Sequence, residues 1–309
     1  MLPAMRPLVV LGSVNADLYV EIDRLPVPGE TLPGGAAAVR PGGKGANQAA
    51  AAARLGCPVR FVGQVGSDPF AGDLRAALAG AGVDTQALAT VSGPTGQAFI
   101  LLQRGGENSI IIVGGANRAW EAPPAGFAAI LAGAGALLLQ REVPEPVNLA
   151  AARAARAAGI PVVLDAGGDD GPLPAELLPL LTVVSPNESE LARLTGMPTG
   201  THGEVLAAAR TLQAGGCGTV LVKLGARGCL LVGREVLAQD AFRVPVVDTT
   251  GAGDCFTGAY TAALIGGLPE QERMRRACAA AALCVQGKGA LPSMPDSTTV
   301  AAFLASRGG

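Results

Sequence analysis

The chain has 309 residues and a mass of 30.6 kDa, enough to bury one large core or two modest ones. Apolar residues make up 49% and charged residues 16%, a composition that excludes an intrinsically disordered protein. The net charge is −2 and no Lys/Arg-rich run occurs, so the sequence lacks the electrostatic signature of a nucleic-acid-binding protein.

The sequence contains no evident membrane-spanning or secretory segment. The longest apolar stretch without a charged residue, 122–140, contains two prolines, and its useful part, 125–139, is too short to cross a bilayer. Residues 1–11 carry one arginine and a short apolar patch, unlike a signal peptide. We expect a cytoplasmic protein, an expectation that leaves open an organellar targeting segment upstream of Met1.

Cysteine and histidine usage limits the possible chemistry. The six cysteines contain no Cys-x-x-Cys pair, which favours reduced, mostly buried thiols. The single histidine, His202, excludes a multi-histidine metal site and lies in a Gly/Thr-rich stretch typical of a surface loop. Acid–base chemistry is therefore expected to fall to carboxylates.

Short Val- and Leu-rich runs alternate with Ala- and Leu-rich segments of helical period. This pattern predicts strands at 8–11, 59–63, 136–140, 161–165, 182–185 and 219–223, with helices at 45–55, 70–79, 146–158, 188–194 and 204–214. Further on it predicts a hairpin at 228–232 and 236–238, and helices near 252–264, 270–286 and 298–306. Near-continuous apolar strands separated by helices indicate an α/β three-layer sandwich with a mostly parallel central sheet.

One pair of segments departs from this rhythm. Residues 97–103 and 108–113 are β-type runs joined by a turn signal at 104–107. With 18–22 and 35–40 they predict a small sheet. We expect this sheet, built from about residues 16–41 and 96–114, to project from a single domain that covers residues 1–309. Such a projection serves as a lid over a ligand, as a dimer contact, or as both.

The segment 247–258, Val-Asp-Thr-Thr-Gly-Ala-Gly-Asp-Cys-Phe-Thr-Gly, predicts an anion site. Its glycines precede an Ala-rich helix, and backbone N–H groups at such a helix start can point at one anion. Asp254 would accept the proton of a hydroxyl that attacks a phosphoryl group there. We expect the positive helix end to lower the pKa of Asp254. From spacing alone, an aspartate that caps its own helix is an equal alternative.

Two glycine- and amide-containing loops precede this segment in the chain. Residues 40–48, Arg-Pro-Gly-Gly-Lys-Gly-Ala-Asn-Gln, are not a Walker A loop, but their glycines allow close approach to a ligand. Residues 12–17, Gly-Ser-Val-Asn-Ala-Asp, follow the first apolar strand, at the sheet edge where α/β proteins bind ligands. In isolation, residues 40–48 are equally well explained as a loop-to-helix turn with a surface lysine, and residues 12–17 are a weak signal because Asn and Asp are common in turns.

A fourth polar segment, Pro186–Glu190, follows another apolar strand. Asn187 and Glu190 would share a helix face and could reach a phosphate or a hydrated magnesium ion. A helix cap by Asn187 is the alternative.

Taken together, these motifs resemble the ribokinase-like (PfkB) family of ATP-dependent carbohydrate kinases over nearly the whole chain. Both family signatures occur, at 42–47 and 248–258, and the order and separation of the motifs match. The amino-acid sequences of 42–48 and of 12–17 resemble those of the family members that phosphorylate ribose. The resemblance implies transfer of a phosphoryl group from MgATP to the 5-hydroxyl of D-ribose, giving ribose 5-phosphate and ADP.

The resemblance also implies roles for individual residues. Asp254 would be the catalytic base, and the anion hole would comprise Gly251, Ala252 and Gly253. The sugar would be held by Asn15, Asp17, Gly43, Lys44, Asn47, Glu142 and Asp254. ATP would contact Asn187, Lys223, Leu224, Gly225, Ala226, Arg227, Gly228, Gly253 and Cys278. Magnesium would be held through water by Asn187 and Glu190. Potassium would be held by Asp248, Thr250, Cys284, Gly287, Gly289 and Ser293.

Some positions depart from the family pattern. Lys223 stands where such kinases often carry threonine, which would put a cation near the ATP phosphates or the adenine edge. Cys278 takes a place where Asn or His is expected, and Gly287 can be a long side chain in relatives. Asp165-Ala166-Gly167-Gly168 replaces an Asn-Pro-Ala-type turn.

Alternative functions come from the same family and from other classes. The nearest is a kinase for fructose, deoxyribose, another pentose or a nucleoside, although few aromatic residues are available to stack on a base. A phosphosugar would need extra cations, for which Arg104 and Arg141 are candidates. Asp254 disfavours a non-catalytic sugar sensor, and the missing GxGxxG after the first strand disfavours an NAD-dependent oxidoreductase. We expect no nucleic-acid or membrane partner, and a homodimer formed through the lid.

Overall fold

The computed structural model describes residues 5–104 and 107–308. The strands are β1 (Leu8–Leu11), β2 (Asn15–Ile22), β3 (Ala37–Gly42), β4 (Val59–Val65), β5 (Val83–Asp84), β6 (Leu88–Thr90), β7 (Gly96–Gln103), β8 (Asn108–Val113), β9 (Ala136–Leu139), β10 (Val162–Asp165), β11 (Val183–Ser185), β12 (Thr219–Lys223), β13 (Cys229–Val232) and β14 (Val236–Gln239). The α-helices are α1 (Lys44–Arg54), α2 (Phe70–Gly80), α3 (Phe127–Leu131), α4 (Glu145–Ala157), α5 (Glu188–Thr195), α6 (His202–Ala214), α7 (Ala252–Ile265), α8 (Glu270–Cys284) and α9 (Ser297–Ser306).

The large sheet has the strand order β14-β13-β12-β11-β10-β9-β1-β4-β5, and β6 also pairs with β4. Pairing is parallel from β12 through β11, β10, β9 and β1 to β4. The hairpin β13–β14 adds an antiparallel edge beyond β12. The predicted α/β class with a mostly parallel central sheet is confirmed.

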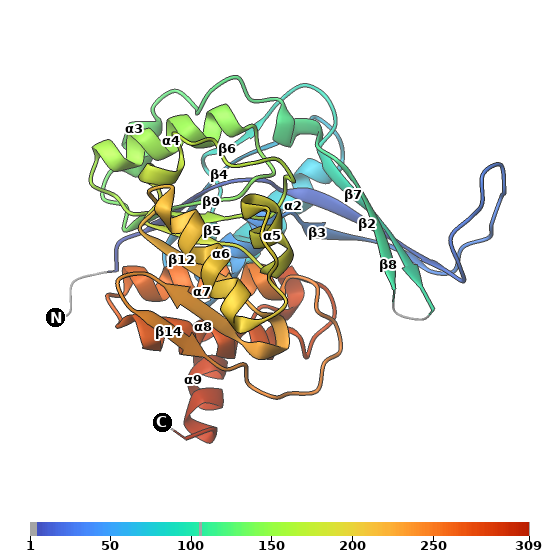
Figure 1. Cartoon of the computed structure of the whole chain (residues 1–309). Helices are drawn as coiled ribbons and strands as arrows, with labels where there is room; N and C mark the ends of the chain where they lie inside the picture. The colour runs from blue at the N-terminus through green and yellow to red at the C-terminus, as the bar shows by residue number, and fades with distance from the viewer. Residues whose placement is uncertain (1–4, 105–106, 309) are drawn as a thin grey trace.

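Each central strand contributes to two cores because its side chains alternate between the sheet faces. All four residues of β1 are fully buried. Leu8 and Val10 pack in a core with α1, α2, α7 and α8, whereas Val9 and Leu11 pack in a core with α3, α4, α5 and α6. Helices therefore cover both faces of the sheet, as the near-continuous apolar strands predict (Figure 1).

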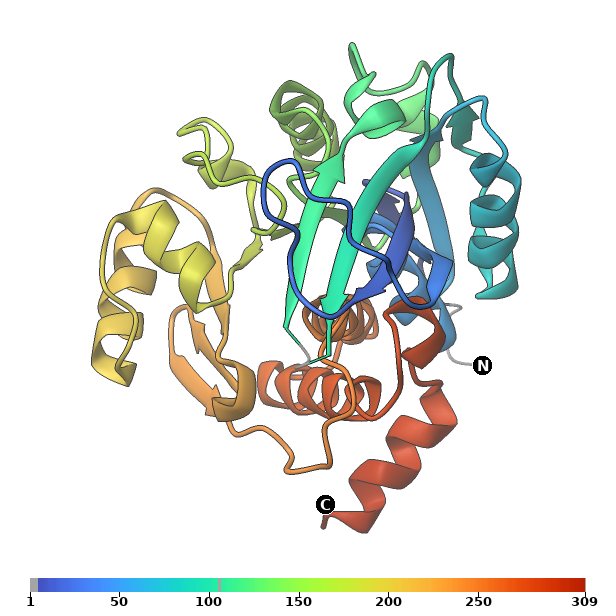
Figure 2. The same ribbon diagram turned by 90° about the vertical axis from the view of Figure 1, so that its right-hand side faces the viewer.

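The small sheet has the order β3-β2-β7-β8 and projects from the body of the molecule (Figure 1), and Figure 2 views it from the side on which it projects. Strands β2 and β7 pair in parallel, and β3 and β8 pair antiparallel on either side of them. The expected turn at 104–107 falls partly outside the described residues, because 105 and 106 are not described. The strand β2 begins at Asn15, so the polar motif of 12–17 leads directly into this sheet.

Two features of the structure differ from the predictions. His202 is exposed but begins α6 rather than lying in a loop, because Thr201 and Glu204 form a capping box at the helix start. The elements α3, β5 and β6 were not predicted, since they are too short to show a period. Within the described part of the chain, no helix is long and apolar enough to cross a membrane.

Candidate active site

Polar residues gather at the carboxyl edge of the large sheet. Ser13 follows β1, Glu142 follows β9, Asp165 ends β10 and Lys223 ends β12. The hydroxyl of Thr257 on α7 donates to Asp165 at 2.8 Å and brings the start of that helix to the same edge. Ligands bind at this edge in open α/β sheets, because the loops that follow the strands converge there.

Asp254 lies in the first turn of α7 with 7% of its surface exposed. Its carboxylate accepts hydrogen bonds from Nδ2 of Asn47 at 2.9 Å and from Nε2 of Gln48 at 3.0 Å. The residue before the helix is Gly251, and no side chain caps this end. Asp254 is therefore hydrogen-bonded to α1 and does not cap its own helix, the alternative that the spacing alone leaves open.

The prediction that the helix end lowers the pKa of Asp254 is wrong. Burial raises the pKa of this carboxyl above its usual range, and the charge of Asp165 adds to the increase. Lys44 and the two amide donors oppose the shift, but desolvation is larger. A carboxylate with a raised pKa is a stronger base, which suits proton abstraction.

The start of α7 needs its glycine. Gly251 has φ of 78°, and a Cβ at this position would lie 2.6 Å from the Cβ of Ala290. The N–H of Ala252 donates to the carbonyl of Thr249 at 3.2 Å. Among the described residues, no hydrogen bond uses the N–H of Gly251 or Gly253. In the predicted anion hole, the N–H groups of Gly251 and Gly253 are thus available for an anion, whereas the N–H of Ala252 already donates to Thr249.

Glu142 ties together two loops that are distant in sequence. Its Oε2 accepts from the hydroxyl of Ser13 and from the backbone N–H of Lys44, the latter at 3.0 Å. The N–H of Gly45 donates to the same Ser13 hydroxyl at 3.3 Å. The loop after β1, the start of α1 and the loop after β9 therefore form one unit.

A chain of amides supports Asp254 from behind. Gln140 donates to Oε1 of Gln48 at 2.8 Å, and Asn148 donates to the carbonyl of Gln140 at 2.8 Å. Among the described residues, the buried Oδ1 of Asn47 has no hydrogen-bond partner. An unpaired buried acceptor is costly, so Asn47 Oδ1 is ready for a donor from a ligand.

A cavity of about 190 Å³ opens beside Asn15 and Glu142. It is lined by Asn15, Ile112, Gly114, Asn117, Arg118, Glu142 and Gly168. Sequence reasoning selected Asn15 and Glu142 but missed Asn117 and Arg118. Asn117 is buried, and its Nδ2 donates to Oδ1 of Asn15 at 2.7 Å. Ile112 belongs to β8, so the projecting sheet forms one wall.

Asp17 lies at the base of the small sheet, beside the same cluster. Burial raises its pKa to about 7, and the charges of Glu142 and Asp254 contribute. A Cβ on Gly42 would lie 2.0 Å from Oδ2 of Asp17, so a larger residue at that position of β3 would displace the Asp17 carboxylate. Gly43 also needs to be glycine, since it has φ of 91° and its Cβ would lie 2.9 Å from the backbone nitrogen of Asn15.

The amine of Lys44 lies near Gly167 and Glu190. A Cβ on Gly167 would lie 2.6 Å from Nζ of Lys44 and 2.8 Å from Oε1 of Glu190, so these two groups flank the same glycine. Burial disfavours the charge of Lys44, but its pKa is raised overall by four surrounding carboxylates, those of Asp254, Asp165, Glu142 and Glu190. The amine therefore lies between residues predicted to bind the sugar, Asp254 and Glu142, and Glu190, which is predicted to hold magnesium.

Asn187 and Glu190 are joined in a capping box at the start of α5. Oδ1 of Asn187 accepts from the N–H of Glu190 at 2.8 Å, and Oε2 of Glu190 accepts from the N–H of Asn187 at 2.7 Å. The capping role is confirmed, and it leaves Oε1 of Glu190 facing Gly167. No cluster of three or more acidic, histidine or cysteine side chains in the described residues could hold a metal ion.

The loop 223–228 runs beside α5. Arg227 forms an ion pair with Glu188, and the N–H of Lys223 donates to the carbonyl of Pro186 at 2.9 Å. Leu224 is buried, and Gly225 and Ala226 form a short turn. Cys278 is less accessible than expected of a ligand residue, because its thiol packs in the core 3.7 Å from that of Cys229.

The residues predicted to hold a monovalent cation come together in one loop cluster. Asp248 accepts from the N–H and hydroxyl of Thr250 at 2.9 and 2.6 Å, and from the N–H of Gly289 at 2.8 Å. The Ser293 hydroxyl donates to the Gly289 carbonyl at 2.5 Å. Burial alone would raise the pKa of Asp248, but these hydrogen bonds and the charge of Arg40 hold it below its usual range.

Gly287 and Cys284 complete this cluster. The N–H of Gly287 donates to the carbonyl of Cys284 at 3.1 Å, and a Cβ on Gly287 would lie 2.7 Å from the Cβ of Ser293. The cluster therefore offers a carboxylate, hydroxyls and carbonyls, a donor set that suits a hard cation.

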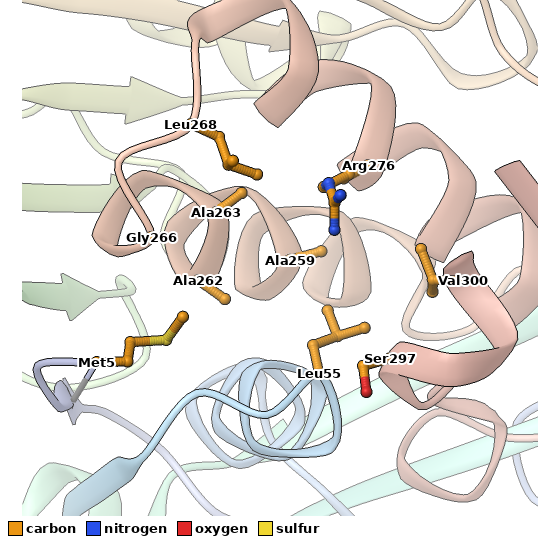
Figure 3. A pocket seen from close by; sticks show the side chains of 10 residues that line it. All are labelled: Met5, Leu55, Ala259, Ala262, Ala263, Gly266, Leu268, Arg276, Ser297 and Val300. Atoms are coloured by element: carbon orange, nitrogen blue, oxygen red, sulfur yellow. The ribbon is translucent and has the colours of Figure 1, made fainter. Parts of the chain in front are cut away.

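A larger cavity of about 250 Å³ lies elsewhere, among α7, α8, α9 and the start of the described chain (Figure 3). Its lining is apolar except for Arg276 and Ser297, and the guanidinium of Arg276 is paired with Glu272 at 2.7 Å. It contains none of the predicted site residues, so the polar edge of the sheet is the better candidate.

Comparisons with known proteins bear on this site. Residues 5–297 match the model of the pfkB family carbohydrate kinases. The chain is 48% identical to a ribokinase of Arabidopsis thaliana, over 96% of this chain and 81% of the relative. It is 39% identical to a ribokinase of Haemophilus influenzae, over 97% and 98%. A deoxyribokinase of Salmonella typhi is 35% identical, over 94% and 95%.

Solved structures agree with these matches. The structure of Arabidopsis thaliana ribokinase complexed with ribose and ATP has a TM-score of 0.93 at 47% identity and covers 96% of this chain and 98% of that chain. A ribokinase from Thermotoga maritima has a TM-score of 0.86 at 35% identity, over 97% and 99%. Together with the family match over almost the whole chain, these similarities confirm the resemblance that the motifs predict: the chain belongs to the pfkB family of carbohydrate kinases.

Proposed function

We propose that this protein is an ATP-dependent kinase that phosphorylates D-ribose at its 5-hydroxyl, giving ribose 5-phosphate and ADP. One observation carries the proposal: Asp254 at the start of α7 is hydrogen-bonded to Asn47 and Gln48 of α1, whose first turn also anchors Glu142. The base and the sugar-binding groups thus form one rigid unit. The similarity to ribokinases at up to 48% identity supports ribose as the substrate.

In the proposed reaction, the 5-oxygen of ribose forms a bond to the γ-phosphorus of ATP as the bond to the bridging oxygen of ADP breaks. The proton of the hydroxyl passes to the carboxylate of Asp254. Positioning and charge stabilisation supply most of the catalysis in such a loose transition state. The N–H groups of Gly251 and Gly253 would stabilise the transferred charge, with Ala252 shaping the turn.

The sugar side of the site comprises Asn15, Asp17, Gly43, Asn47 and Glu142. The raised pKa of Asp17 and the unpaired oxygen of Asn47 support this assignment, because both groups gain from hydroxyl donors. Lys44 would lie between sugar and phosphates rather than on the sugar alone.

The nucleotide side comprises Asn187, Glu190 and the loop 223–228, with Gly253 and Cys278 as further predicted contacts. Magnesium would reach this side with the ATP phosphates, held through water by Asn187 and Glu190. Asn187 Oδ1 and Glu190 Oε2 are already used in the capping box, which leaves Glu190 Oε1 as an acceptor. This supports binding of the magnesium ion through its water molecules rather than by direct coordination. When bound, the ion would neutralise phosphate charge.

Potassium would bind at Asp248, Thr250, Cys284, Gly287, Gly289 and Ser293. The oxygen-rich donor set of this cluster supports a hard monovalent cation. Through Gly251, which packs on Ala290, these residues would set the shape of the anion hole.

A phosphosugar substrate is less compatible with the site. Arg141 is 2% exposed, pairs with Glu145 and donates to the carbonyls of Asp169, Gly171 and Pro172, so it is not available for a substrate phosphate. Arg104 is exposed on the small sheet and pairs with Asp23.

We further propose that residues 1–309 act as one catalytic domain whose small sheet, from about 16–41 and 96–114, closes over ribose and forms a homodimer. By the strand register, Val39, Phe99, Ile111 and Val113 are exposed on one face of that sheet, an apolar patch that suits a partner subunit, while Ile110 and Ile112 lie on the other face, which borders the cavity. A mass near 30 kDa in solution would contradict the dimer. A cytoplasmic location stays a prediction.

A substrate panel tests the proposed function. ADP release would be measured with D-ribose, 2-deoxyribose, D-fructose and nucleosides, in potassium and in sodium, and the phosphorylated carbon identified by NMR. We expect the highest kcat/KM with ribose, phosphate at carbon 5, and stimulation by potassium. Equal turnover of fructose would contradict the ribose assignment.

A further inference from the structure

Asp165, at the end of β10, is a buried carboxylate to which the proposed mechanism gives no task. It is 0% exposed. Its Oδ2 accepts from Nζ of Lys223 at 2.6 Å and from the hydroxyl of Thr257 at 2.8 Å, and its Oδ1 accepts from the N–H of Gly167 at 3.0 Å. Asp165 therefore joins β12, α7 and its own loop.

This carboxylate is ionised in the folded protein. Burial alone would raise its pKa, but the charges of Lys223 and Lys44 and the hydrogen bonds it accepts bring the pKa below its usual range. A buried charge persists when it is paired and hydrogen-bonded in this way. The partner lysine is thus held in a fixed place by a permanent opposite charge.

The ammonium of Lys223 stands against the start of α7. A Cβ on Gly253 would lie 3.9 Å from Nζ of Lys223. An ammonium group has three N–H donors. Among the described residues, Nζ of Lys223 donates one hydrogen bond, to Asp165, and makes no other. Two donors are left beside the N–H groups proposed to receive the transferred phosphoryl group.

We propose that Asp165 is a positioning residue that fixes Lys223 as a clamp on the γ-phosphoryl group of ATP. The inference rests on the proposed kinase function and deepens it. A free lysine loses much rotamer freedom when it binds a phosphate, and the pairing with Asp165 removes that loss before the nucleotide arrives. The clamp acts on the third phosphate, so it favours ATP over ADP.

Four variants test the proposal: Lys223→Met, Asp165→Asn, the double variant, and Lys223→Arg. Arg234→Met, which removes an exposed cation from the β13–β14 turn, is the matched control. Affinities for a non-hydrolysable ATP analogue, for ADP and for ribose would be measured by calorimetry with magnesium present, together with kcat and KM.

Lys223→Met is expected to weaken binding of the ATP analogue by about 10-fold to 100-fold and to leave ADP and ribose affinities within about 3-fold. Its kcat should fall by about 100-fold. Asp165→Asn should act in the same direction with about a 10-fold effect, and Lys223→Arg should restore part of the lost affinity. The double variant should match Lys223→Met rather than multiply the two effects, because Asp165 acts through Lys223.

Lys223→Met leaves Asp165 without its partner and could fold poorly, but the double variant removes both charges and keeps the test intact. A double variant with the wild-type preference for the ATP analogue and wild-type kcat would overturn the clamp. Multiplied effects would overturn the positioning role of Asp165. Failure of the proposed function looks different, since wild-type protein would then release no ADP with ribose.

Discussion

On the proposed sugar side, hydrogen bonds join segments far apart in the chain, whereas on the proposed nucleotide side Asn187 and Arg227 pair with a near neighbour or with one opposite charge. Glu142 links the loop after β1 to α1, and Asp254 links α7 to α1. Asn187 instead caps its own helix, and Arg227 pairs with Glu188 at a half-exposed position. The difference indicates that the proposed sugar side is organised before its ligand arrives, whereas on the proposed nucleotide side it is Lys223, paired with the buried Asp165, that is held in the same way.

The largest effect is expected from Asp254→Asn. The substitution keeps the shape of the side chain but removes the base, so kcat should fall about 1000-fold. Ribose affinity should stay within a few-fold, because the neighbouring sugar-side groups are unchanged. Single-turnover kinetics and calorimetry measure the two quantities, and a near-normal kcat would show that another group takes the proton.

Glu142→Ala removes the acceptor that holds Ser13 and the start of α1. Because hydrogen bonds to a charged group are lost, KM for ribose should rise by about 30-fold while KM for ATP changes little. Steady-state kinetics with each substrate varied in turn would check this. Equal increases in both KM values would mean that the two sides are not organised separately.

Ribose binding should depend on pH through Asp17, whose pKa is about 7. Only the ionised carboxylate accepts two hydroxyl donors, so affinity should increase about 10-fold from pH 6 to pH 8. Asp17→Asn should bind weakly and without this pH dependence. Calorimetry at several pH values decides, and an unchanged profile in the variant would contradict the role of Asp17.

The same pKa affects stability in the absence of ligand. It lies above the ordinary value of 3.8, so the folded protein retains a proton that the unfolded chain releases. The resulting stabilisation is complete below about pH 4 and is lost as the pH rises through 7. The difference in Tm between Asp17→Asn and wild type should therefore grow in favour of the variant over this range.

Asn187→Ala should have the smallest effect. Loss of the cap is expected to lower the free energy of unfolding by about 1 kcal/mol and to raise KM for ATP a few-fold. Thr201→Ala is the matched control, because Thr201 forms an equivalent capping box with Glu204 at the start of α6. If both variants lose stability and leave KM for ATP unchanged, Asn187 is a cap without a nucleotide role.

Much of the fold could be predicted from the sequence, because its strands are apolar on both faces and its helices show a clear period. The anion turn at Gly251 and the loop 42–47 could also be found, since their glycines are local signals. Asn117 could not, because it meets Asn15 across a separation of 102 residues. The pKa of Asp254 was predicted in the wrong direction because desolvation depends on packing that no local pattern reveals.

The geometry of the proposed chemistry can be tested directly by a crystal structure with ribose and a non-hydrolysable ATP analogue. We predict that the 5-hydroxyl lies within about 3 Å of a carboxylate oxygen of Asp254, with the terminal phosphate against Gly251 and Gly253. A sugar bound with that hydroxyl turned away from Asp254, or seated outside the cavity of Asn15 and Glu142, would contradict the account.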